Sequence, residues 1–250
     1  MHFVEVSKEE RVATVVLSRG KVNALNEALV EELKTCFEEL VDDEDVRAVI
    51  LTGRGKFFSF GLDIPELLPY SKEAFSEFMA RFTDLYTQIF LFPKPVVAAL
   101  NGHAIAGGCM LATAGDCRIM AEGRAKIALN EILIGSTVLT GAVEILKACV
   151  GHRNAETILY SGFMYTAEEA LALGLIHHKT SAENLYPEAR RIALEFAETD
   201  PAAFRGVKLL LRKPLADQFI PREAQSISQF VDIWYSESTR KKLSEVKIQN

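Results

Sequence analysis

The sequence predicts an α/β protein in which helices cover a β-sheet, and three observations support this fold class. Apolar β-rich runs alternate with amphipathic helical runs through the first 60 residues. The same cycle of strand and helix recurs as far as residue 129, and the final third of the chain has mainly helical patterns. With 250 residues, of which 49% are hydrophobic and 25% charged, the chain can bury a substantial core.

The first elements are a strand, a helix and a second strand. Residues 12–17 form the continuous apolar run that is typical of a strand buried on both faces. Asn26 has the side chain of an N-cap, and the apolar residues after it recur at helical spacing. Residues 46–51 predict another buried strand that ends at a glycine-containing loop. The apolar stripe of the helix comprises Leu29, Leu33, Phe37 and Leu40.

The cycle continues between residues 72 and 129. Residues 72–90 predict a helix, and residues 95–100 predict a strand that closes at the turn dipeptide Asn101-Gly102. Two more strands are predicted, over residues 117–121 and 127–129.

Helices are predicted for the last third of the chain. Thr166 and Glu169 have the spacing of a capping box, and Gly174 is placed to end the helix that they begin. Three further helices are expected, over residues 182–198, 201–212 and 221–236. Four apolar residues of the last helix are expected to dock on the body of the protein or on another subunit: Ile227, Phe230, Ile233 and Trp234.

Charge and hydropathy argue against two classes of partner. The formal net charge is -6 and the pI is about 5.5, so the chain as a whole lacks the basic surface that binds nucleic acids. The longest apolar stretch, residues 89–100, is interrupted by Pro93, Lys94 and Pro95 and is shorter than the roughly 20 residues of a membrane span. We therefore expect neither a nucleic acid nor a membrane as partner.

The cysteines indicate a reducing environment. All four lie in apolar surroundings without C-x-x-C spacing, which favours buried thiols over disulfides or a zinc site. No targeting motif is found at either end of the sequence, so a cytoplasmic location is expected. The cysteines are Cys36, Cys109, Cys117 and Cys149.

Two loops are candidates for binding an anion through backbone N–H groups: residues 57–64 and residues 102–108. A helix that opens at Gly107-Gly108 would leave free N–H groups at its positive end, and glycine lets a ligand approach the backbone closely. Such a site suits a developing oxyanion. The pattern alone is also typical of a tight packing turn, which is the commoner occurrence.

Several motifs together resemble the crotonase, or enoyl-CoA hydratase/isomerase, superfamily. They are residues 58–63 (FSFGLD), residues 95–116 (PVVAALNGHAIAGGCMLATAGD), Leu129-Asn130-Glu131 and Gly151-His152-Arg153, and they extend in order over nearly the whole chain. The resemblance implies a crotonase (ClpP-like) spiral of ββα units with a helical C-terminal region. Residues 1–190 would form the spiral core for acyl-CoA binding and catalysis, and residues 191–250 a helical region for oligomerisation and for covering the active site.

Within the superfamily the motifs are most similar to the mitochondrial-type Δ3,Δ2-enoyl-CoA isomerases. The resemblance implies an acyl-CoA thioester as substrate, with coenzyme A as part of it, no other cofactor and no metal. It also implies a homotrimer or a dimer of trimers.

The family's functional residues can be placed on this sequence. The two backbone donors of the oxyanion hole fall on Phe60 and Gly107. Of the two glutamates that act in the hydratases, the first falls on Met110 and the second on Glu131, as in isomerases that keep a single glutamate as base. The remaining substrate contacts fall on Ala24, expected to meet the adenine, on Asn130, and on the loop of Phe60, Gly61, Leu62, Asp63 and Ile64. Phe60 departs from the small residue usual in the family, so its ring is expected to crowd the acyl chain or the pantetheine arm.

One carboxylate suffices for an isomerase. If Glu131 removes the α proton of a 3-enoyl-CoA and returns it to the γ carbon, the double bond moves into conjugation without consuming water. Met110 would make the opposite wall apolar and disfavour hydration. Taken singly, the residues have more ordinary explanations: a solvated glutamate, a core methionine, and for Asp63 either an N-cap or a ligand contact.

Two other functions remain open from the sequence. One is hydration or another crotonase reaction, with Asp63 or the loop of residues 136–140 supplying the base. The other is a non-catalytic protein that binds coenzyme A or RNA, for which a basic stripe on one helix would serve. The stripe would comprise Arg205, Lys208, Arg212 and Lys213.

Overall fold

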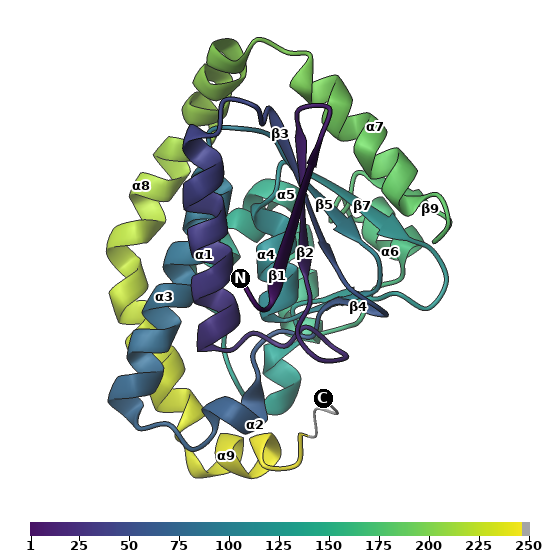
Figure 1. Cartoon of the computed structure of the whole chain (residues 1–250). Helices are drawn as coiled ribbons and strands as arrows, with labels where there is room; N and C mark the ends of the chain where they lie inside the picture. Colours follow the sequence, from purple (N-terminus) through teal and green to yellow (C-terminus); the bar gives the residue numbers. More distant parts are fainter. Residues whose placement is uncertain (247–250) are drawn as a thin grey trace.

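Repeated units of strand, strand and helix form the body of the protein in this computed structural model, which describes residues 1–246 (Figure 1). A six-stranded sheet has the order β1-β2-β3-β5-β7-β9, and a three-stranded sheet has the order β4-β6-β8. Each of β3, β5 and β7 in the large sheet is followed along the chain by a strand of the small sheet. The predicted α/β spiral of ββα units is therefore confirmed.

The strands pair in parallel except for the first two. β1 and β2 are antiparallel, and every other pair in both sheets is parallel. The large sheet contains β1 (Val4–Glu9), β2 (Val12–Leu17), β3 (Ala48–Gly53), β5 (Val96–Leu100), β7 (Cys117–Ala121) and β9 (His178–Thr180). The small sheet contains β4 (Phe57–Ser59), β6 (His103–Ile105) and β8 (Ile127–Ala128).

Helices lie on both sides of the large sheet. In chain order, the helices before residue 135 are α1 (Glu27–Asp42), α2 (Ile64–Leu67), α3 (Lys72–Leu91), α4 (Gly107–Ala114) and the 3-10 helix η1 (Glu131–Ile134). They are followed by α5 (Thr140–Ser161), α6 (Ala167–Ala172), α7 (Leu185–Ala197), α8 (Pro201–Trp234) and α9 (Glu237–Leu243).

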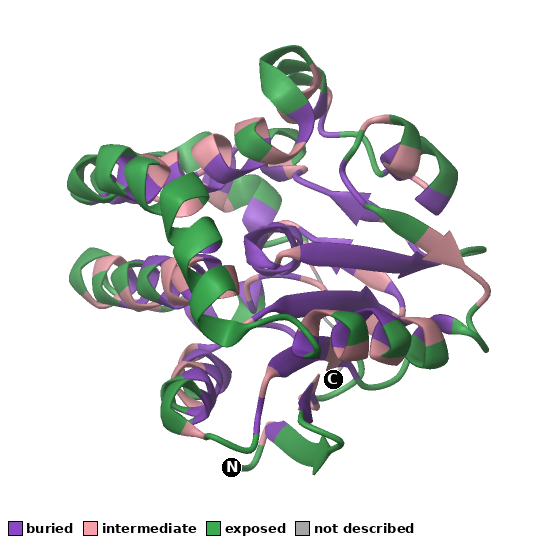
Figure 2. Ribbon diagram, turned by 90° about the horizontal axis from the view of Figure 1, so that it is seen from above, coloured by how far each residue is buried: buried purple, intermediate pink, exposed green. Residues whose placement is uncertain are grey.

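Alternate residues of the central strands face two different cores. In β3, Ile50 packs toward α7, whereas Val49 packs into the larger core formed with α1, α3 and the helices beyond them. Figure 2 shows the buried strands enclosed between these helical layers. This two-sided burial explains why the strands appear in the sequence as continuous apolar runs.

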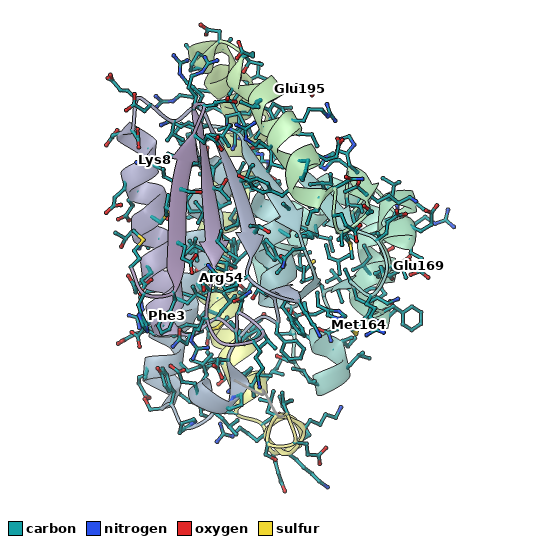
Figure 3. The ribbon with its side chains drawn as sticks, turned by 45° about the vertical axis from the view of Figure 1, so that its right-hand side comes forward. Phe3, Lys8, Arg54, Met164, Glu169 and Glu195 are labelled. Atoms are coloured by element: carbon teal, nitrogen blue, oxygen red, sulfur yellow. The ribbon has the colours of Figure 1, made fainter. Side chains whose placement is uncertain are left out.

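Most predicted elements are confirmed. Strands 12–17 and 117–121 have the predicted bounds, whereas strand 46–51 begins two residues later. The Asn26 side chain caps α1 by accepting from the Leu29 N–H at 3.0 Å. Thr166 and Glu169 form the capping box, with Glu169 at the surface (Figure 3), and Gly174 follows at a φ of 76°.

Several elements were not anticipated correctly. Strands β4 and β6 lie in segments predicted as loops, and β9 and α9 were not predicted. The edge strand β1 was missed because only its first residue is buried, so it has no apolar pattern. Helix α5 was not predicted. The two helices predicted over residues 201–212 and 221–236 are one helix, α8, which continues through Pro214 and Pro221. Burial of Ala216 and Phe219 between the two prolines holds the helix together despite the hydrogen bonds that proline removes.

The basic stripe predicted for RNA binding does not form. Lys208 is buried, and its Nζ lies 2.7 Å from Asp116 Oδ2, while Arg212 Nη2 lies 3.0 Å from Asp116 Oδ1. Two of the four cations therefore neutralise a structural carboxylate inside the protein. Of the other two, both exposed, Lys213 pairs with Asp217 at 2.7 Å. Asp116 therefore has a structural role.

The long helix α8 docks on its own chain. α8 packs against α3 and α5, and Trp234 stacks on Phe75 with ring centroids 4.5 Å apart. Ile227, Phe230 and Trp234 are buried, whereas Ile233 is partly exposed.

No helix of residues 1–246 is long and apolar enough to cross a membrane.

Candidate active site

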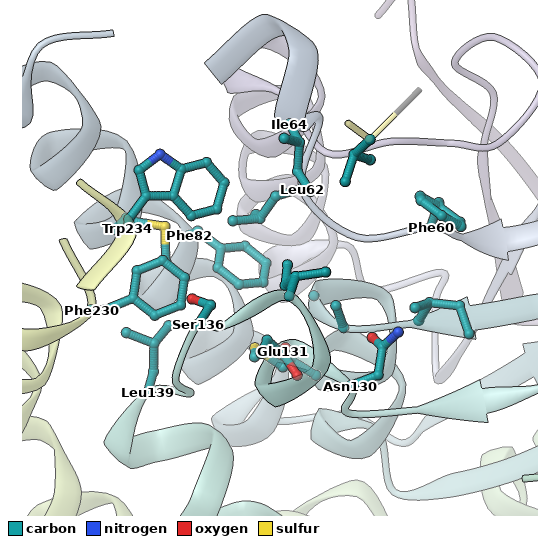
Figure 4. A pocket seen from close by; sticks show the side chains of 17 residues that line it. Phe60, Leu62, Ile64, Phe82, Asn130, Glu131, Ser136, Leu139, Phe230 and Trp234 are labelled. Atoms are coloured by element: carbon teal, nitrogen blue, oxygen red, sulfur yellow. The ribbon is translucent and has the colours of Figure 1, made fainter. Parts of the chain in front are cut away.

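A cavity of about 110 Å³ brings together most of the residues predicted to act on substrate. The rings of Phe82, Phe230 and Trp234 lie together at one end, Phe60 and Asn130 lie toward the other, and Glu131 lies between them (Figure 4). The predicted residues that line this cavity, called the acyl pocket below, are Phe60, Leu62, Ile64, Gly107, Met110, Asn130 and Glu131.

Glu131 is the only acidic residue that lines the acyl pocket within the described chain. Glu131 is 5% exposed, and neither of its carboxyl oxygens makes a hydrogen bond to any part of residues 1–246. Burial raises the pKa of Glu131 to about 8, against a smaller lowering effect of its own backbone amide. A carboxyl with this pKa can both accept and release a proton near neutral pH.

Short backbone contacts fix Glu131 in place. It opens η1 directly after β8 and Asn130, and Gly135 ends this turn with a φ of 76°, a conformation that glycine adopts without strain. The Ser136 N–H then donates to the Glu131 carbonyl at 3.0 Å. The turn therefore holds Glu131 and Ser136 close to each other.

Met110 is the residue on which the family resemblance places the first glutamate of the hydratases. It lies in α4, a helix with every residue buried, and it lines the same pocket as Glu131. The prediction that Met110 and Glu131 belong to one site is therefore consistent with the lining of the pocket.

The backbone donors differ in part from the prediction. The Phe60 N–H donates to the Val22 carbonyl at 2.9 Å, so it is not free to bind a ligand, and its assignment as a donor is wrong. Within residues 1–246, no hydrogen bond is found from the N–H of Leu62 or from that of Gly107, the first residue of α4. Both of these residues line the acyl pocket.

Two loops meet where these free amides lie. The backbone of Leu25 forms hydrogen bonds with both neighbours of Leu62. The Leu25 N–H donates to the Gly61 carbonyl at 2.7 Å, and the Asp63 N–H donates to the Leu25 carbonyl at 2.9 Å. Gly61 has a φ of 90°, and a Cβ placed on it would lie 3.0 Å from Gly107 N and 2.8 Å from Ile105 O. Only glycine allows this close approach, which brings the loop of Leu62 against the start of α4.

Three of the predicted ligand contacts do not line the acyl pocket: Ala24, Gly61 and Asp63. Asp63 is 2% exposed, caps α2 by accepting from the Glu66 N–H at 3.3 Å and pairs with Arg19 at 2.6 Å. The N-cap interpretation of Asp63 is therefore confirmed, and its roles as ligand contact or alternative base are not supported. Ala24 is completely buried and its carbonyl accepts from Arg19, so it has no surface for an adenine in this conformation.

The far end of the pocket was not predicted as part of the site. Phe82, Leu139, Phe230 and Trp234 come from three different helical regions, and the sequence pattern identifies them only as apolar helix faces or core residues. Ser136, a member of the loop considered for an alternative base, also lines the pocket.

A buried carboxylate anchors the wall that contains Leu139. Glu223 of α8 accepts from the Gly141 N–H at 2.7 Å, from Ser226 Oγ at 2.7 Å and from the Tyr86 hydroxyl. A negative charge at the start of α5 is stabilised by the helix dipole. Helix α8 thus supplies two aromatic rings of the pocket, Phe230 and Trp234, and also the carboxylate that caps α5.

Comparisons with known proteins give consistent results. The family model described as enoyl-CoA hydratase/isomerase matches residues 7–246. Enoyl-CoA delta isomerase 1, mitochondrial, from Rattus norvegicus is 29% identical over 243 residues, which cover 96% of this chain and 84% of the rat protein. A probable enoyl-CoA hydratase from Bacillus subtilis (strain 168) is 34% identical over 214 residues, covering 84% of this chain and 82% of that protein.

Among solved structures, the crystal structure of human mitochondrial delta3-delta2-enoyl-CoA isomerase is similar to this chain, with a TM-score of 0.93 and 28% sequence identity. The match covers 97% of this chain and 95% of the human chain.

Proposed function

Because the chain belongs to the enoyl-CoA hydratase/isomerase family, we propose that it is a Δ3,Δ2-enoyl-CoA isomerase that converts a 3-enoyl-CoA into the trans-2-enoyl-CoA. The observation that carries this proposal is the lone carboxyl group of Glu131 in a pocket where Met110 takes the place of a second one. The similarity to the rat and human isomerases supports it.

The reaction needs a base that removes a proton from one carbon of the substrate and then donates a proton to another. Glu131 as carboxylate removes a proton from the α carbon, and the resulting acid delivers it to the γ carbon, so that one group performs both transfers. Its pKa of about 8 suits this double role. The reaction as proposed uses no cofactor other than the coenzyme A of the substrate.

The thioester oxygen needs hydrogen-bond donors as negative charge develops on it. The free N–H groups of Leu62 and Gly107 line the pocket, and Gly61 brings their two loops into contact. We assign this pair as the oxyanion hole, with Leu62 in place of Phe60. Donors fixed in a protein wall stabilise the enolate without having to reorganise.

The apolar surroundings favour isomerisation over hydration. Met110, Phe82 and Ile105 offer no group that could hold a nucleophilic water on their part of the wall, and among its described residues the pocket provides no second carboxyl group that would activate such a water together with Glu131. Hydration remains the second candidate function because the Bacillus subtilis relative, described as a probable hydratase, is 34% identical.

The proposal is tested by supplying the purified protein with two thioesters in parallel. With 3-hexenoyl-CoA, absorbance of the conjugated thioester is expected to rise; with crotonyl-CoA, little loss of conjugation is expected. Rapid hydration of crotonyl-CoA without isomerisation of 3-hexenoyl-CoA would favour the second candidate and contradict the first.

Replacing Gly61 by alanine is expected to lower kcat for isomerisation by roughly 10²–10³-fold, the effect typical of losing an oxyanion donor. The added Cβ would lie 3.0 Å from Gly107 N and would push the two donor loops apart. Steady-state kinetics should show a larger effect on kcat than on KM.

Gly55→Ala is the matched control for this substitution. Gly55 also has a positive φ, 79°, but a Cβ there meets no described atom within 4 Å. Both variants therefore carry similar backbone strain, and only Gly61→Ala displaces the amides. Equal kcat in the two variants would argue against this assignment of the oxyanion hole.

A further inference from the structure

A second cavity, of about 450 Å³, adjoins the acyl pocket. Helix α5 and the loop after η1 form most of its wall. Of the described residues, only Glu131 and Ser136 line both cavities. The base of the proposed reaction therefore has one cavity for the substrate and another cavity beside it.

The two shared residues carry polar groups that the protein leaves unsatisfied. Glu131 is 5% exposed and Ser136 is 8% exposed, and their side-chain oxygens make no hydrogen bond to the protein within residues 1–246. Buried polar groups without partners are costly, so both call for a partner from outside the chain. A water molecule fits where a cavity is roomy and provides at least two polar contacts, and this wall provides a carboxyl and a hydroxyl.

The second cavity is open to the solvent, unlike the far end of the acyl pocket. His152 lines it with a side chain that is 72% exposed, and Lys147 and Glu156 add further polar groups. The acyl pocket, by contrast, ends at the rings of Phe230 and Trp234 (Figure 4). Glu131 and Ser136 therefore separate the acyl pocket from a cavity with a polar, solvent-exposed rim.

We infer that the second cavity is a water entrance to Glu131, in which the Ser136 hydroxyl holds the water that contacts the carboxyl group. This inference rests on the proposed isomerase function and adds a solvent exchange step to it. Ser136 is a positioning residue here, since it acts on the proton only through the bound water.

The exchange step balances without any added reagent. Glu131 takes the α proton and becomes a carboxylic acid, while the substrate becomes a dienolate. The acid passes this proton to the water held by Ser136 and receives another proton from that water, which is in turn exchanged with the solvent. The carboxylic acid then protonates the γ carbon, so no water is consumed and the net reaction is unchanged.

The test follows isomerisation of 3-hexenoyl-CoA in D₂O and measures deuterium at C4 of the product by mass spectrometry and NMR. The wild-type product is expected to contain deuterium at C4. Ser136→Ala is expected to lower the ratio of deuterium to protium at C4 roughly fivefold, which corresponds to the loss of one hydrogen bond. Ser136→Thr keeps the hydroxyl and is expected to retain most of the exchange.

A second variant narrows the entrance without touching the acyl pocket. Val143 lines only the second cavity, so Val143→Phe is expected to reduce deuterium at C4 while isomerisation continues. Val207→Phe, on an exposed site of α8, is the matched control and should leave the deuterium content unchanged. Protium alone at C4 in the wild-type product, or the same deuterium content in wild type, Ser136→Ala and Val143→Phe, would overturn the inference.

A saturated thioester separates this inference from the proposed function. Exchange of the α hydrogens of hexanoyl-CoA in D₂O needs Glu131 and solvent access but no shift of a double bond. One possible outcome is that this exchange occurs and is slowed by Val143→Phe, while 3-hexenoyl-CoA is not isomerised. This outcome would support the water entrance and contradict the isomerase proposal. Isomerisation with protium alone at C4 supports the isomerase proposal and overturns the entrance, and the absence of both reactions contradicts both.

Discussion

Replacement of Glu131 by glutamine is expected to lower kcat/KM for 3-enoyl-CoA isomerisation by about 10²–10⁴-fold, the range typical of losing general acid–base catalysis. Glutamine has nearly the same shape but can neither take the α proton nor release one to the γ carbon. Because Glu131 is the one acidic side chain of the acyl pocket in the described chain, no neighbour can replace it. The measurement is the initial rate of formation of the conjugated thioester.

The control for this prediction is Glu156→Gln, which makes the same chemical change at a half-exposed side chain that lines only the second cavity. Its kcat/KM should stay near the wild-type value. If Glu131→Gln retained activity within a few-fold of wild type, another group would have to move the proton and the proposed mechanism would be wrong.

The same substitution is expected to stabilise the protein at alkaline pH. The pKa of Glu131 is about 8 in the folded protein because the charged form is desolvated, against an ordinary value of 4.5. Between these two values the folded state keeps a proton that the unfolded state has released, so wild-type stability falls as the pH rises through this window. Glutamine does not ionise, and its variant avoids this loss.

Glu131→Gln should therefore be more stable than the wild type by on the order of 5 kcal/mol at pH 9, with little difference near pH 4.5. Urea unfolding of both proteins across this pH range measures the effect. Parallel stability curves would show that the carboxyl is not held in a desolvated site. Lower activity together with higher stability would mark Glu131 as a residue kept for its chemistry.

Local patterns in the sequence predicted most of the secondary structure. The mainly apolar runs of β2 and β7, the N-cap Asn26 and the Thr166 capping box each depend on residues close together in the chain. Their signals can therefore be read without tertiary information. Helix α8 was predicted as two helices because proline signals a break locally, whereas packing of Ala216 and Phe219 overrides that signal.

The candidate site was predicted only in part. Glu131, Met110 and Gly107 were placed correctly in one pocket through the family resemblance. Phe60 was chosen as a donor in error, because whether an amide is free depends on the carbonyl opposite it, here that of Val22, which is 38 residues away in the sequence. The same reason applies to Asp63 and Ala24, which Arg19 engages inside the protein.

The sequence by itself determined the family, the α/β alternation and the presence of a single carboxylate where a hydratase has two, because these properties are carried by residue types and their order. The tertiary structure alone decided which amides are free, which rings close the acyl pocket and that Glu131 and Ser136 border two cavities. These features arise from contacts between segments far apart in the chain. Hydrogen bonding and burial at such contacts are properties of the folded arrangement, and no local pattern encodes them.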